Sequence, residues 1–115
     1  MDKVFQGMIA ISGAITSFLY GGWPLLMNIL LAFVAIDYIT GLIEGKLSSK
    51  VGWKGIAKKV AIFLIVAVAH MIDIALEITT DIVRNAVIFF YLANELLSII
   101  ENAGRIGIPI PRILL

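Results

Sequence analysis

Apolar residues gather into four stretches along the chain, and polar residues mark the boundaries between them. The stretches cover residues 4–20, 24–43, 60–78 and 82–100. Their lengths are close to the ~17–25 residues that a helix needs to cross a bilayer. The pattern predicts an all-α, polytopic membrane protein, folded as a single membrane domain over residues 1–115, with four transmembrane helices. The stretch at 4–20 is short and rich in glycine, serine and threonine. The alternative is therefore three spans, with 4–20 lying in the interface.

The segments between the stretches carry turn and boundary signals. Gly21 and Gly22 break the first helix, Pro24 suits the first position of the next helix, and Trp23 suits the water–lipid boundary. The acidic turn at 77–81 is short, so the third and fourth stretches form an antiparallel helical hairpin. Residues 101–115 form a polar tail in which glycines and prolines block further helix.

Composition supports a membrane environment. The chain is 61% hydrophobic and 15% charged, whereas a soluble domain is nearer ~45–50% apolar and ~25% charged. A chain of 115 residues also has too much surface for its volume to hide so many apolar side chains from water. The absence of cysteine excludes a disulfide framework, a thiol nucleophile and a sulfur-ligated metal.

Gly41 and Gly45 have the spacing G-x-x-x-G at the end of the second stretch. This spacing lets two helix backbones approach closely in a membrane. The alternative is that Gly45 simply ends the helix, and the sequence alone leaves both interpretations open.

The segment 45–59 is the longest polar segment, and it is basic without containing an acid. Three of its lysines recur at i, i+4, i+8, which predicts a short interfacial helix whose lysines reach anionic headgroups. An ordinary solvated loop is the alternative. The headgroup-contacting candidates are Lys46, Lys50, Lys54, Lys58 and Lys59.

The distribution of lysine and arginine predicts the orientation. With four spans, the N-terminus, the basic loop 45–59 and the C-terminal tail share one side of the membrane. That side holds most of the basic residues, so the positive-inside rule makes it cytoplasmic. Both termini would then be cytoplasmic. If the stretch at 4–20 does not span, only the N-terminus moves outside.

Ionisable residues inside the apolar stretches are functional candidates, because a charge at the bilayer centre costs ~2.5–3.5 kcal/mol on insertion scales. His70, Asp73 and Glu77 share one helical face. Arg84 begins a second polar face and could reach Asp73 across the hairpin. These faces either satisfy each other inside a monomer or drive self-association and line a water-filled lesion. The candidates for assembly or lesion lining are Asp37, His70, Asp73, Glu77, Arg84 and Glu95.

Other chemistries find no support in the residues. His70 has no second His or Cys to complete a metal site. There is no catalytic triad pattern, phosphate loop or nucleotide fingerprint. We therefore expect neither an enzyme nor a cofactor nor a nucleic-acid partner, and we expect membrane lipid as a partner.

Two long segments resemble the phage holins of the toxin-secretion/phage-lysis type: DYITGLIEGKLSSKVGWKGIAKK at 37–59 and FYLANELLSIIENAGRIGIPIPRIL at 90–114. The resemblance extends through AHMID at 69–73 and is weakest before Trp23. It implies a small protein of the host bacterial cytoplasmic membrane that forms homo-oligomeric lesions. It also implies a functional link to an endolysin, or to an exported toxin. The family implies no catalytic residue.

Two other classes remain open at this point. A small four-helix transporter or channel subunit would have the same size, with buried carboxylates at a repeat interface. Such transporters usually place an essential Glu in the first span, whereas 4–20 has no charge. The second class is an antiholin or accessory protein that binds a holin and delays it. Met8 could be the second start of such a paired product, although an ordinary internal Met is the simpler interpretation.

Overall fold

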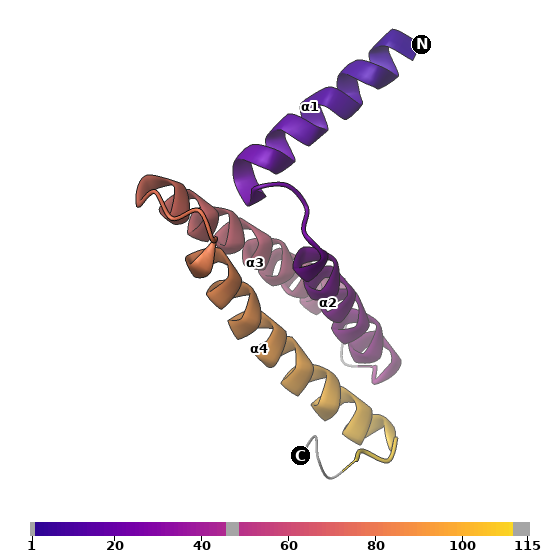
Figure 1. Ribbon diagram of the computed structural model, residues 1–115. Coiled ribbons are helices and arrows are strands. Elements are labelled where there is room, and N and C mark those ends of the chain that lie inside the picture. Colours follow the sequence, from indigo (N-terminus) through magenta and orange to yellow (C-terminus); the bar gives the residue numbers. More distant parts are fainter. Residues whose placement is uncertain (1, 46–48, 112–115) are drawn as a thin grey trace.

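The computed structural model describes residues 2–45 and 49–111, with side chains at 2–45 and 53–111. This part of the chain contains four helices and no strand, which confirms the predicted all-α architecture. Figure 1 shows the helices in order. Their bounds are Asp2–Tyr20 for α1, Leu25–Ile43 for α2, Ser49–Ala75 for α3 and Ile82–Ile106 for α4.

Three segments within these helices are long and apolar enough to cross a membrane: Leu25–Ile43, Trp53–Ala75 and Ile82–Ile106. The chain is therefore a polytopic membrane protein. Within the described residues, α1 does not reach the same apolar character. This favours the three-span arrangement over the four-span arrangement.

The helices α2, α3 and α4 form a bundle in which α4 packs against both of the others. Figure 1 shows α4 running beside them along its length. A small apolar core joins them, and most other large apolar side chains point outward, as expected for helices that face lipid. The core side chains are Met27, Leu30, Val34, Ile62, Val66 and Ile88.

The bounds of α3 correct the prediction for the basic segment. Ser49 begins α3, so residues 49–59 are the first turns of the third helix and not a separate interfacial helix or loop. Lysine is a good helix former, and its long side chain can carry the ammonium to water from a helix that enters lipid. A polar composition was therefore a poor sign of a helix boundary here. Lys46 lies outside the described residues.

Three helix ends lie where the sequence predicted them: α1 ends at Tyr20, α2 ends at Ile43 and α4 begins at Ile82. The other ends differ from the prediction. The third helix ends at Ala75 and not at residue 78, because Glu77 adopts a left-handed conformation with φ 57°. The fourth helix continues to Ile106, and Gly107 with φ 96° ends it. Gly45, with φ 78°, follows the C-cap residue Glu44 and prevents α2 from continuing.

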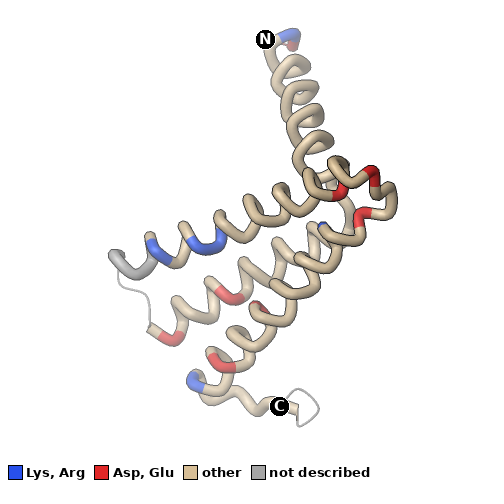
Figure 2. Tube along the Cα trace, turned by 90° about the vertical axis from the view of Figure 1, so that its left-hand side faces the viewer, with Lys and Arg blue, Asp and Glu red and all other residues tan. Residues whose placement is uncertain are grey.

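The first helix leaves the bundle at the end where α3 turns into α4. In Figures 1 and 2, which view the molecule from perpendicular directions, α1 crosses the direction of α2, α3 and α4 instead of continuing it. Its last residue is held to the bundle, since the Tyr20 hydroxyl donates a hydrogen bond to the Phe63 carbonyl at 3.1 Å. No residue of α1 is buried.

Candidate assembly site: two interior polar clusters

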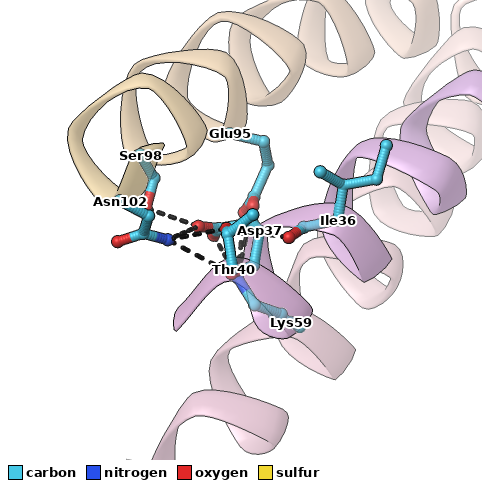
Figure 3. Close-up of polar contacts among 7 residues, drawn as sticks. All are labelled: Ile36, Asp37, Thr40, Lys59, Glu95, Ser98 and Asn102. Carbon is cyan, nitrogen blue, oxygen red and sulfur yellow. Dashed lines mark hydrogen bonds and ion pairs between the residues drawn. The ribbon is translucent and has the colours of Figure 1, made fainter. Parts of the chain in front are cut away.

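Polar side chains from all three bundle helices meet in the half of the bundle where α2 ends and α3 begins. We call this group the loop-end cluster, and Figure 3 shows all of its members around Asp37. The carboxylate of Asp37 accepts hydrogen bonds from Ser98 Oγ at 2.6 Å, Asn102 Nδ2 at 3.0 Å and Lys59 Nζ at 2.6 Å. The members are Asp37 and Thr40 of α2, Lys59 of α3, and Glu95, Ser98 and Asn102 of α4.

Lys59 is the cation of the loop-end cluster. Its Nζ lies 2.6 Å from Asp37 Oδ2 and 3.2 Å from Glu95 Oε2, so one ammonium bridges two carboxylates. Asp37 and Glu95 are each only 6% exposed. Removing a buried charge from such a set leaves the remaining charges unpaired in a medium that solvates them poorly. The bridging lysine therefore holds α2 and α4 together through α3.

The helical period explains why these residues meet. On α4, Glu95, Ser98 and Asn102 recur at i, i+3, i+7, so they lie along one face. The sequence predicted this polar face, and the structure turns it inward against α2. On α3, Lys59 precedes the buried Ile62 and Val66 at the same spacing, which carries its stem into the core.

Beside the loop-end cluster the bundle has a hollow of about 280 Å³. Its lining includes Asp37, Lys59 and the exposed Lys58, together with Gly41 and Gly55. Glycine has no side chain to fill the space between α2 and α3 at this level. The cluster thus lies against open space at one end of the bundle.

A second group, the hairpin-end cluster, lies at the opposite end, where α3 turns into α4. Asp73 of α3 is fully buried at 0% exposure. Its carboxylate accepts hydrogen bonds from the backbone N–H groups of Val83 at 3.0 Å and Arg84 at 2.8 Å. The first turn of a helix leaves its N–H groups without intrahelical partners. Asp73 therefore caps α4 from the neighbouring helix.

This capping compensates for an irregular start of α4. The residue at the N-cap position, Asp81, has a left-handed backbone with φ 54° and makes no side-chain cap. Its side chain is engaged elsewhere: Oδ1 lies 2.7 Å from His70 Nδ1, and Oδ2 lies 3.2 Å from Arg84 Nη1. The turn between α3 and α4 is thus fixed by side chains from both helices.

Arg84 connects the hairpin-end cluster to α1. Its Nη1 donates a hydrogen bond to the Tyr20 carbonyl at 2.6 Å, and its Nε and Nη2 donate to Asn85 Oδ1. The sequence indicated that the Arg84 side chain could reach Asp73, whereas in the structure the backbone N–H of Arg84 contacts Asp73. The guanidinium turns to α1 and Asp81 instead. The members of this cluster are Tyr20, His70, Asp73, Asp81, Arg84 and Asn85.

The structure divides the predicted site residues into several groups. Asp37 and Glu95 lie in the loop-end cluster, and His70, Asp73 and Arg84 lie in the hairpin-end cluster. Glu77 belongs to neither, because its side chain is exposed on the turn. Lys54 and Lys58 are exposed, as a headgroup contact requires, and the side chain of Lys50 lies outside the described part of the chain.

Lys59 is the residue that sequence reasoning misplaced. It was grouped with the lysines that reach headgroups, yet its ammonium points inward to Asp37 and Glu95. A signal was present: Lys59, Ile62, Val66, His70 and Asp73 follow one helical face. In a third helix that is continuous from Ser49, Lys59 lies on the same face as the two polar candidates His70 and Asp73.

Three apolar helices with charged groups buried between them are the features of a small helical membrane protein whose ion pairs lie inside the helix bundle. The model of the bacteriophage holin family matches residues 14–115, so the chain belongs to this family.

Relatives extend the comparison. The chain is 53% identical to the uncharacterized protein Lmo0128 of Listeria monocytogenes, over 99% of this chain and 84% of the relative. It is 37% identical to an uncharacterized 14.9 kDa protein in the nagH 3' region of Clostridium perfringens, over 96% of this chain and 86% of that one. A probable holin of Bacillus phage phi105 is 37% identical, over 76% of this chain and 67% of the phage protein. No solved structure matches the chain significantly.

Proposed function

We propose that the protein acts as a holin: it accumulates in the bacterial cytoplasmic membrane and then oligomerises into lesions that release an endolysin. Membership of the holin family and similarity to a probable phage holin support this function. The main observation behind the proposed mechanism is that charged groups are buried between helices whose outer surfaces are apolar.

The two clusters suggest how one chain can be harmless first and lytic later. In a single copy, Asp37 and Glu95 share the ammonium of Lys59 in the interior, and the body presents mainly apolar side chains to lipid. Charged groups in a membrane are tolerated when they pair or face water. If helices from many copies separate and pack again, the same groups can line a wet lesion at a modest energetic cost.

The orientation follows from three spans. The end of α2, the start of α3 and the end of α4 lie at one end of the bundle, and the 77–81 turn and the attached end of α1 lie at the other. Lys54 and Lys58 lie on the helix that starts at the first end. The positive-inside rule makes that end cytoplasmic. The N-terminus is then outside, which differs from the four-span expectation.

The test is co-expression in a bacterium with an endolysin that lacks a signal sequence. We expect growth to stop abruptly and the cells to lyse, with neither event when the endolysin is expressed alone. Continued growth with the endolysin retained in the cells would contradict the proposal. Resistance to a particular compound without lysis would support the transporter class, and delayed lysis by a separate holin would support the antiholin class.

A further inference from the structure

The first helix carries a continuous apolar stripe that no other part of the described chain covers. Its members recur at i, i+4, i+7, i+11 and i+14, which places them along one face. Their exposed fractions range from 53% to 67%. The stripe residues are Val4, Met8, Ile11, Ile15 and Phe18.

The opposite face of α1 carries two polar and two small residues, and the exposed Phe5 and Ile9 lie between the two faces. Gln6, Ala10, Gly13 and Ser17 recur at i, i+4, i+7 and i+11. A helix surrounded by lipid is apolar all round, whereas a helix with one apolar and one polar face lies in the plane of the interface. The two faces of α1 fit the second case, which agrees with its absence from the helices that are apolar enough to span.

The attachment of α1 places its last residue beside the hairpin-end cluster. Arg84 of the hairpin-end cluster donates to the Tyr20 carbonyl, and the Tyr20 hydroxyl donates to the carbonyl of Phe63, near the middle of α3. Directly after Tyr20, the Trp23 ring stacks on Phe63 with centroids 6.5 Å apart, and its Nε1 donates to Asn28 Oδ1 at 2.6 Å. Tryptophan with a wet polar end and an apolar ring is typical of the water–lipid boundary.

The direction of α1 is the last observation that bears on its position relative to the membrane. If α2, α3 and α4 cross the membrane, a helix that starts at their outer end and crosses their direction runs along the membrane surface (Figures 1 and 2). We propose that α1 binds the lipid surface on the side of the 77–81 turn, with the Val4–Phe18 stripe in the headgroup–acyl boundary. This goes beyond the proposed lytic function, because it holds whether or not the chain forms lesions.

Single-cysteine spin labelling of the full chain tests this placement. The sequence has no cysteine, so each introduced thiol is unique. Labels go to the stripe at Met8, Ile11 and Ile15. Matched labels go to the opposite face at Gln6, Gly13 and Ser17, and a Cβ at Gly13 would meet no atom within 4 Å. In phosphatidylcholine–phosphatidylglycerol vesicles, collisions with oxygen report lipid exposure and collisions with a water-soluble nickel chelate report water exposure.

We expect the oxygen-to-nickel ratio to rise and fall with the helical period, with the three stripe labels in lipid at shallow depth and the other three labels in water. A single maximum of the oxygen-to-nickel ratio near Ile11, with no difference between the two faces of the helix, would mean that α1 spans the bilayer. Shielding of the stripe from both reagents would mean that a second copy covers it, and nickel access at all six labels would mean that α1 leaves the membrane. Each of these three results overturns the proposal, and none depends on lysis.

Discussion

At the scale of single residues, the capping of α4 by Asp73 is the contact with the clearest energetic consequence. Asp73→Ala leaves the N–H groups of Val83 and Arg84 without their acceptor in the interior. Each such loss costs ~1–3 kcal/mol, so we expect a loss of ~2–6 kcal/mol in the free energy of unfolding, measured by denaturant titration in micelles. Asp73→Asn keeps one carbonyl oxygen and should lose less.

The control for this prediction is Glu77→Ala, four residues further along the chain. Glu77 is exposed on the turn, so its truncation should change stability by no more than ~0.5 kcal/mol. Equal unfolding midpoints for Asp73→Ala and Glu77→Ala would show that Asp73 does not hold the start of α4.

The second residue-scale prediction concerns Lys59 and its neighbour Lys58. Lys59→Met removes the cation between two buried carboxylates, and breaking a buried ion pair on one side costs ~3–5 kcal/mol. Lys58→Met changes the same side chain at an exposed position. The same titration should show a large loss for Lys59→Met and almost none for Lys58→Met. Similar values for the two variants would argue against an inward Lys59.

At the scale of elements, the sequence predicted α2 closely and α3 poorly, for physical reasons. Pro24 and Gly45 limit α2 by backbone conformation, which the residue type itself imposes. The start of α3 has no such signal, because a lysine-rich segment is polar and also helix-forming. Periodicity placed Asp73 on an inner face. It could not show that the Arg84 guanidinium would turn to Tyr20, 64 residues away in sequence, because that partner depends on how α1 is attached.

The attachment of α1 gives an element-scale prediction at Gly21. This residue has φ 72°, and a Cβ there would lie 2.7 Å from His70 Cε1. Gly21→Ala should therefore displace the end of α1 from the hairpin-end cluster. Spin labels at Ser12 on α1 and Ile65 on α3 report the distance between the two helices, and we expect this distance to change or its distribution to broaden.

Gly22→Ala is the matched control for Gly21→Ala. Gly22 also has a positive φ, 98°, so alanine meets a similar backbone strain there, but no atom lies within 4 Å of its Cβ position. If both variants shift the Ser12–Ile65 distance equally, the strain and not the His70 contact sets the direction of α1.

At the scale of the whole molecule, the proposed three spans would place the two ends of the bundle on opposite sides of the membrane. Thr80 lies in the turn between α3 and α4, and Glu101 lies near the end of α4; both are exposed. A membrane-impermeant thiol reagent on intact cells should label Thr80→Cys and Asp2→Cys but not Glu101→Cys. Labelling of Glu101→Cys would reverse the orientation. Protection of Asp2→Cys would return the chain to four spans.

The proposed lytic function leads to a prediction for the loop-end cluster. The triple variant Asp37→Asn/Lys59→Met/Glu95→Gln removes all three charges together. Replacing a buried ionic set by neutral groups is often neutral or stabilising by ~1–4 kcal/mol. The single chain should therefore remain folded in the membrane before assembly, while a lesion made from the variant would lack these charged side chains in its lining. We expect wild-type amounts of the protein in the membrane and a later onset of lysis, followed by optical density and membrane immunoblots.

The matched control is Lys58→Met/Glu77→Gln/Glu101→Gln, which also removes one base and two acids but only at exposed positions. This variant should lyse at the wild-type time, because none of its side chains belongs to either cluster. Wild-type timing for the cluster variant, at wild-type amounts in the membrane, would show that Asp37, Lys59 and Glu95 serve only the fold of the single chain. The lining of the lesion would then have to come from other residues. A delay in the cluster variant alone would connect the buried charges to assembly, because both triple variants change the overall charge by the same amount. The two variants differ in whether the replaced side chains are buried or exposed.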